Sequence, residues 1–132
     1  MKILRVLNPE ISVQLIPWYV PDDKTPIEIG MELDQRMRED SDNTGVFVAV
    51  KNGYLKAMLI GYMEGETLFV WQARKSKDMD RPRLIFHELC RWAKAKGAKK
   101  AQLKSSDKRV RRMYKRKYGF TPLGGPLMER TI

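Results

Sequence analysis

The fold is decided by a short stretch near the C-terminus, Lys117-Tyr118-Gly119-Phe120-Thr121-Pro122, which ends a basic segment and opens a strand. Asp107 can cap the helix that Gly119 would end. Helical spacing predicts an inward face made of Val110, Met113, Tyr114 and Tyr118. The outward face is predicted to comprise Lys108, Arg109, Arg111, Arg112, Lys115 and Arg116.

A second amphipathic helix is predicted upstream, over residues 81–96, with Pro82 near its start and Gly97 at its C-terminal end. Its apolar face would contain Ile85, Phe86, Leu89, Trp92 and Ala93. A strand over residues 98–104 joins the two helices. Two short strands, over residues 120–123 and 127–131, are predicted to end the chain.

The N-terminal half begins with a predicted strand over residues 3–7, followed by a helix that Asn8 can cap and that Pro17 limits. Thr25 can cap a second helix that reaches about Glu39. Residues 41–45 are expected to form a loop. Strands are then predicted at residues 46–50, 54–63 and 67–73, joined by the hairpin signals Asn52-Gly53 and Glu64-Gly65.

The predicted order is β-α-α-β-β-β-α-β-α-β-β, and no linker or repeat divides the 132 residues. A chain of this length matches one domain. Helices inserted between strands of a mostly antiparallel sheet define a mixed α/β, or α+β, architecture. We therefore predict one domain over residues 1–132.

Charge is divided unevenly along the chain. Residues 1–66 carry 7 Lys/Arg and 11 Asp/Glu, a net charge of −4, whereas residues 67–132 carry 19 and 5, a net charge of +14. A half this basic attracts polyanions, such as nucleic acid, the phosphates of a nucleotide-bearing cofactor or an acidic protein surface. Solvated surface lysines and arginines are the alternative interpretation.

Cys90 is the single cysteine, so the chain alone can build neither a disulfide framework nor a Cys-rich metal site. Residues 1–7 are too short and too charged for a signal sequence, and no stretch approaches the roughly 20 apolar residues of a membrane-spanning helix. We expect a soluble, non-exported protein of the cytoplasm, without a metal or a membrane partner.

The order of elements, together with residues 89–97 and 110–120, resembles the GCN5-related N-acetyltransferase (GNAT) family. Residues 89–97 are similar to the end of the family's cofactor helix, and residues 110–120 to its next characteristic block. The resemblance implies a mostly antiparallel sheet with helices on both faces, in which the fourth and fifth strands part to hold acyl-coenzyme A. Small divergent members occur in bacteriophages, so the resemblance is compatible with a phage source and with a location in the host cytoplasm or the virion.

The loop that should hold the cofactor is degenerate. The family uses a Gln/Arg-x-x-Gly-x-Gly/Ala loop whose backbone N–H groups bind the pyrophosphate at a helix N-terminus. The corresponding residues 77–82 contain no glycine, Pro82 has no N–H, and Asp78 and Asp80 would repel a phosphate. Cationic side chains nearby could bind phosphates instead. The resemblance places the acetyl-coenzyme A site at Gln72, Ala73, Arg74, Lys75, Lys77, Arg81 and Arg83.

The resemblance also implies catalytic roles. Many family members use a glutamate near the start of the fourth strand as general base, and Glu66 falls at that position. A tyrosine of the last helix serves as general acid for the leaving thiolate, and either Tyr114 or Tyr118 fits. Alternatively, Glu66 is a solvated hairpin residue and the tyrosines belong to the core.

Two functions follow from these expectations. The first is an N-acyltransferase that moves an acetyl or other acyl group from acyl-coenzyme A to an amine, which the acidic N-terminal half could receive. The second is a catalytically inactive binding or structural module, whose basic half contacts nucleic acid or an acidic protein.

Overall fold

The computed structural model describes residues 1–14, 26–79 and 81–132 of the chain. Three features expected from the sequence, the limit at Pro17, the cap at Thr25 and the charge of Asp80, lie outside the described residues. No helix in the described part of the chain is long and apolar enough to cross a bilayer.

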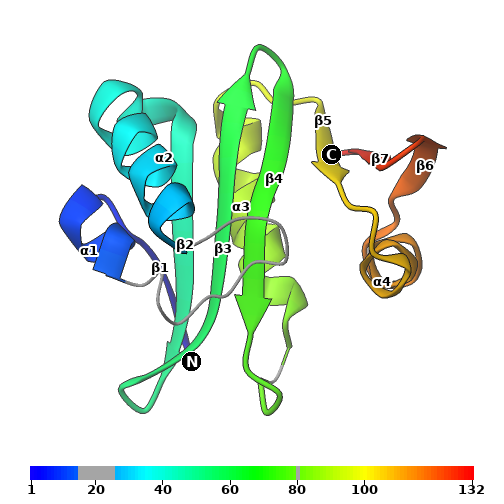
Figure 1. The fold of residues 1–132 in the computed structure, drawn as a ribbon. Coiled ribbons are helices and arrows are strands. Elements are labelled where there is room, and N and C mark those ends of the chain that lie inside the picture. Colours follow the sequence, from blue (N-terminus) through cyan, green and yellow to red (C-terminus); the bar gives the residue numbers. More distant parts are fainter. Residues whose placement is uncertain (15–25, 80) are drawn as a thin grey trace.

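The described residues form one seven-stranded sheet of order β1-β2-β3-β4-β5-β7-β6, shown in Figure 1. The strands are β1 (Lys2–Arg5), β2 (Thr44–Lys51), β3 (Tyr54–Glu64), β4 (Thr67–Lys75), β5 (Lys100–Lys104), β6 (Thr121–Gly124) and β7 (Leu127–Thr131). Every neighbouring pair is antiparallel except β4 and β5, which are parallel. The predicted mixed α+β class with a mostly antiparallel sheet is confirmed.

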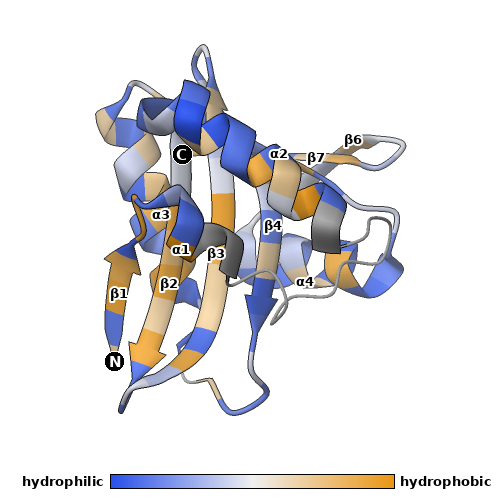
Figure 2. Ribbon diagram, turned by 60° about the vertical axis from the view of Figure 1, so that its left-hand side comes forward, coloured by the Kyte–Doolittle hydropathy of each residue, from blue (hydrophilic) through white to orange (hydrophobic). Residues whose placement is uncertain are grey.

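The helices lie on both faces of the sheet, as predicted. They are α1 (Pro9–Gln14), α2 (Pro26–Glu39), α3 (Arg83–Ala95) and α4 (Lys108–Tyr118), with a 3₁₀ turn, η2 (Ser41–Asn43), before β2. The side chains of α2 pack on one face of β2 and β3, whereas those of α3 and α4 share a second core on the other face. Figure 2 shows hydrophobic residues along β2, which lies between these two layers.

Both cores are built from fully buried apolar side chains. Ile29 and Leu33 of α2 are 0% exposed and belong to the same core as Val46 and Ile60 of the sheet. On the other face, Leu89 of α3 is also 0% exposed. Burying a side chain of this size stabilises a fold by roughly 1.5–3 kcal/mol, so the two layers hold the sheet between them.

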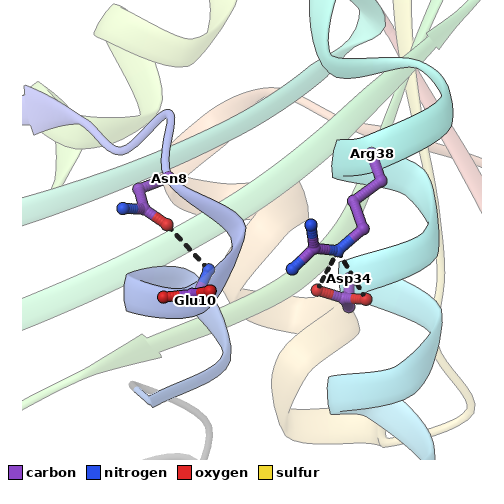
Figure 3. A network of polar contacts seen from close by, with 4 residues as sticks. All are labelled: Asn8, Glu10, Asp34 and Arg38. Carbon is purple, nitrogen blue, oxygen red and sulfur yellow. Dashed lines mark hydrogen bonds and ion pairs between the residues drawn. The ribbon is translucent and has the colours of Figure 1, made fainter.

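Local signals in the sequence set several helix ends. The Asn8 Oδ1 accepts a hydrogen bond from the Glu10 backbone N–H at 2.9 Å, which confirms the predicted cap of α1. Figure 3 shows this cap beside α2, where the Arg38 guanidinium binds Asp34 one turn earlier. Asp107 caps α4 by accepting from the Arg109 N–H at 2.8 Å, and Gly119 ends that helix.

The turns follow the same logic. Asn52 and Gly53 both have positive φ, 53° and 79°, as a two-residue hairpin of type I′ requires. Gly119 adopts φ 72° at the end of α4, where its backbone N–H bonds to the Tyr114 carbonyl. The left-handed region carries no steric penalty for glycine. The hairpin and helix stop predicted from these residues are therefore confirmed.

Some predicted boundaries were wrong by two residues. The strand expected from Val46 begins at Thr44, because Thr44 and Gly45 continue the pairing with β3. The helix expected from Arg81 begins at Arg83, because Arg81 takes φ 52° and Pro82 is the residue before the first helical turn. The strand expected from Ala98 begins at Lys100.

Candidate functional site

The sheet opens between β4 and β5. The two strands pair only at Thr67–Lys100, Leu68–Ala101 and Phe69–Gln102. Beyond Phe69, β4 continues to Lys75 along β3 alone, while β5 pairs with β7 on its other side. Among the described residues, no strand pairs with the outer edge of the C-terminal part of β4, so the two strands part as the resemblance predicted.

A β-bulge lies where the strands part. Ile60 pairs with Gln72 and Gly61 pairs with Val70, which leaves Trp71 as an extra residue on β4. A bulge bends its strand and increases the local twist. Gly61 permits the close packing here, because a Cβ at this position would lie 3.0 Å from the Phe69 carbonyl oxygen and 2.9 Å from Leu68 Cδ1.

A cavity of about 180 Å³ adjoins the free part of β4 on the face covered by α3 and α4. Its walls combine Ala57 and Leu59 of β3 with Ile85 and Phe86 of α3, and its cationic lining is Arg74 and Lys75. The cavity is also lined by Met113 and by three of the predicted site residues, Ala73, Tyr114 and Tyr118. None of the lining residues that the structure describes is acidic.

Met79 occupies part of this space. It lies in the loop between β4 and α3, is 8% exposed and belongs to the core beneath α3. The cavity remains open beside it, with Met79 as one of its walls.

The two candidate tyrosines lie together in an aromatic cluster. The ring centroids of Tyr114 and Tyr118 are 5.2 Å apart, and the Tyr118 ring contacts Phe86 at 4.9 Å in an edge-on arrangement. Burial raises the pKa of the Tyr118 hydroxyl, against the opposing effect of the nearby Arg83 charge. Tyr118 therefore keeps its proton at neutral pH.

Asp78, in the loop between β4 and α3, is bound by two neighbouring side chains. Asp78 accepts a hydrogen bond from Ser76 Oγ at 2.6 Å and an ion pair from Lys56 Nζ at 2.9 Å. These contacts, the Ser76 bond first, lower the pKa of Asp78 to about 2. The repulsion expected from the sequence is therefore offset by the Lys56 ammonium group.

A second, strongly basic cavity of about 510 Å³ lies between α3, the C-terminal end of α4 and β7. It shares Phe86 and Tyr118 with the first cavity, so these two rings form a common wall. Its cationic lining comprises Arg83, Arg91, Lys94, Lys117 and Arg130. Of these five cations, only Arg83 had been predicted as a site residue. The spacing of the basic residues along α3 could have indicated Arg91 and Lys94, but Arg130 arrives from β7 by tertiary packing.

The predicted site residues are divided between the two cavities and the neighbouring surface. Ala73, Arg74, Lys75, Tyr114 and Tyr118 meet at the first cavity, and Arg83 and Tyr118 meet at the second. Gln72 lies half-buried on β4, and Lys77 and Arg81 lie exposed in the loop that leads to α3.

Glu66 is not brought to either cavity. It lies in the turn between β3 and β4, at the end of β4 that remains paired with β5, and its carboxylate contacts Lys99 Nζ at 3.3 Å. Its side chain is 65% exposed. The structure thus places Glu66 in a solvent-exposed ion pair, and its catalytic role stays a prediction.

Comparison with known proteins identifies the fold. No protein-family model matches the chain, and no curated protein sequence matches it. Over 99% of both chains, the structure is similar to an acetyltransferase of the GNAT family from Streptococcus pneumoniae, with 17% identity and a TM-score of 0.66. Over 100% of both chains, it is similar to the PaiA N-acetyltransferase from Thermoplasma acidophilum in complex with coenzyme A, with 13% identity and a TM-score of 0.64.

A third similar structure is the aminoglycoside antibiotic 6′-N-acetyltransferase from Acinetobacter haemolyticus, with 15% identity, a TM-score of 0.72 and 92% of each chain covered. The chain has the fold of the GNAT acetyltransferases, and the resemblance drawn from its sequence is confirmed at that level. The likeness does not favour the alternative of an inactive basic module.

Proposed function

We propose that the chain is an N-acyltransferase that moves an acetyl or other acyl group from acyl-coenzyme A to an amine. The observation that carries this proposal is the parting of β4 from β5 after Phe69, beside a cavity that both candidate tyrosines line. In the part of the chain that the structure describes, the backbone groups of β4 beyond Phe69 face no strand on this side. An extended amide-bearing chain such as pantetheine can pair with such an edge.

The residues near the opening suit a phosphate-bearing substrate. Arg74 and Lys75 line the first cavity, Lys77 and Arg81 lie in the loop, and Arg83 lines the second cavity. Guanidinium groups bind phosphate oxygens in pairs of hydrogen bonds. In this proposal cationic side chains replace the glycine amides that residues 77–82 lack.

The chemistry requires a proton donor for the leaving sulfur. The amine nitrogen bonds to the acyl carbon, the carbon–sulfur bond breaks, and the thiolate takes a proton from a tyrosine hydroxyl. A tyrosine hydroxyl is protonated at neutral pH and so has the proton to give; burial raises the pKa of Tyr118 and keeps it in that form. We assign the role to Tyr118 rather than Tyr114, since Tyr118 lines both cavities.

Glu66 has no part in this mechanism, because it lies at the paired end of β4. The amine therefore loses its proton to water. Nor does α2 offer an obvious receptor for a cationic amine. Its carboxylates at Glu32 and Asp34 already pair with Arg36 and Arg38, one turn further along the helix.

Release of free coenzyme A in the presence of acetyl-coenzyme A and a panel of small amines tests the proposal. Tyr118→Phe should lower kcat by about 10²–10⁴-fold, the usual contribution of general acid catalysis, while the affinity for acetyl-coenzyme A stays close to that of the unmodified chain. Tyr114→Phe is the matched control and should have the smaller effect. Equal activity of the two variants would refute the assignment to Tyr118.

A further inference from the structure

The face of α4 that points away from both tyrosines carries a second basic feature. Arg111, Arg112, Lys115 and Arg116 line a surface hollow of about 320 Å³ between α4 and the last hairpin. Its apolar floor is formed by Pro122 of β6 and Met128 of β7. Figure 1 shows α4 beside β6 and β7, on the side of the molecule opposite α1 and α2.

The charge of this face is uncompensated. Helix α4 contains seven Lys or Arg among its 11 residues and no acidic residue. Among the described residues, no carboxylate lies within 4.0 Å of a basic side chain of α4. Elsewhere the chain does form such pairs, as at Lys99–Glu66 and Lys100–Glu129. Repulsion among neighbouring cations destabilises the helix. A polyanion bound to this face would relieve that repulsion.

We infer that the hollow and the outer face of α4 dock a strand of nucleic acid through its phosphates. Three of the four cations that line the hollow are arginines, whose planar guanidinium groups match phosphate oxygens. At 1.5 Å per residue, the 11 residues of α4 extend about 16 Å, so the cations can follow successive phosphates. Contacts of this kind give affinity without sequence preference.

The hairpin beside the hollow favours a nucleic acid over an acidic peptide. An extended peptide would add to the edge strand β6, but Pro122 has no N–H and the pairing of β6 with β7 is irregular between Pro122 and Gly124. All four residues of β6 are exposed, and Leu123 is 50% exposed. This apolar edge can contact sugars and bases while the cations bind phosphates.

The docking face is separate from the proposed acyl-transfer site. Tyr114 and Tyr118 point inward from α4 and are 7% and 9% exposed, whereas Arg112, Lys115 and Arg116 are exposed on the other side. The two sites can therefore be occupied together, and failure of one proposal does not affect the other.

The test is fluorescence anisotropy of the full chain with a labelled single-stranded DNA of about 20 nucleotides and mixed sequence. Neutralising four phosphates predicts a slope of log K against log salt of about −3, between roughly 50 and 200 mM salt. The double reversal Arg112→Glu/Arg116→Glu should weaken binding at least tenfold and reduce the slope by about 1.4. Its matched control is Lys2→Glu/Arg38→Glu, an equal change of charge on exposed residues of the other half, which should retain most of the affinity.

The inference is overturned if the chain shows no binding at the lowest salt, or if the control weakens binding as much as the α4 reversal. It is also overturned if polyglutamate displaces the DNA as well as unlabelled DNA does at equal charge concentration, because an acidic polypeptide would then be an equal partner. Circular dichroism checks that each variant is folded. Should the reversal unfold the chain, Arg112→Gln/Arg116→Gln replaces it, and unchanged affinity in that variant would contradict the inference.

Discussion

Gly61 lies opposite the point where β4 leaves β5, so a single methyl group there tests the packing that creates the opening. A Cβ at Gly61 would lie 2.9 Å from Leu68 Cδ1, 3.0 Å from the Phe69 carbonyl oxygen and 3.2 Å from Leu89 Cδ2. The side chains can move by a few tenths of an ångström, but the Phe69 oxygen belongs to the backbone of β4. Gly61→Ala must therefore displace β4 itself.

The expected cost follows from these contacts. Overpacking a core by one methyl group costs about 1–3 kcal/mol, and the lower entropy of the unfolded alanine chain returns about 0.4–1 kcal/mol. We expect a net loss of about 1–2 kcal/mol. With an unfolding entropy of about 2.1 cal/mol/K per residue, this loss lowers the Tm of a chain of this size by about 4–7 °C.

Thermal and urea unfolding measure this loss, and Gly45→Ala is the matched comparison. At Gly45 the three nearest atoms to an added Cβ all belong to the Trp92 ring, at 2.8 to 3.1 Å. Because Trp92 is only half-buried, the ring can shift and the cost should be smaller than at Gly61. A Gly61→Ala variant as stable as the unmodified chain, or less affected than Gly45→Ala, would refute the reasoning.

Three further predictions concern single residues. Arg81 has φ 52°, so Arg81→Gly should stabilise the fold by about 1 kcal/mol through relief of backbone strain. Arg81→Ala keeps the strain and should give no such gain. Equal gains in the two variants, measured by urea denaturation, would contradict this reasoning. Asp107→Ala removes the carboxylate that accepts the Arg109 N–H at 2.8 Å, and it should lower the free energy of unfolding by about 0.5–2 kcal/mol. Asp107→Asn should retain most of the stability. An equal loss of stability in the two variants would contradict a capping role. Burial raises the pKa of the Cys90 thiol to about 11, so iodoacetamide should label the folded chain slowly at pH 8. Labelling should become faster as the pH rises toward 11, and it should be fastest in denaturant. Rapid labelling of the folded chain at pH 8 would contradict this prediction.

Local chemistry made much of the fold predictable. Asn8 and Asp107 cap their helices by accepting a hydrogen bond from the backbone N–H two residues later. Asn52-Gly53 forms a hairpin turn in which both residues have positive φ. Each signal acts within a few residues. The positions of these caps and turns, and the alternation of helices and strands around them, could therefore be read from the sequence.

The site depends instead on contacts between distant segments. Arg130 reaches the basic cavity from β7, and Met79 enters the core from a loop without periodicity. The family resemblance implied a catalytic role for Glu66, but the strands part only after Phe69, so Glu66 lies at the end of β4 that stays paired. The sequence does not reveal where β5 leaves β4, because that point depends on the bulge opposite Ile60 and Gly61 and on the packing at Gly61.

Calorimetric titration of the chain with acetyl-coenzyme A tests most directly whether the opening between β4 and β5 is a substrate site. The account predicts saturable heat with one site per chain and competition by free coenzyme A. It also predicts weaker binding in Arg74→Glu/Lys75→Glu, since both side chains line the first cavity. A chain that gives no heat at millimolar acetyl-coenzyme A while remaining folded would contradict the account.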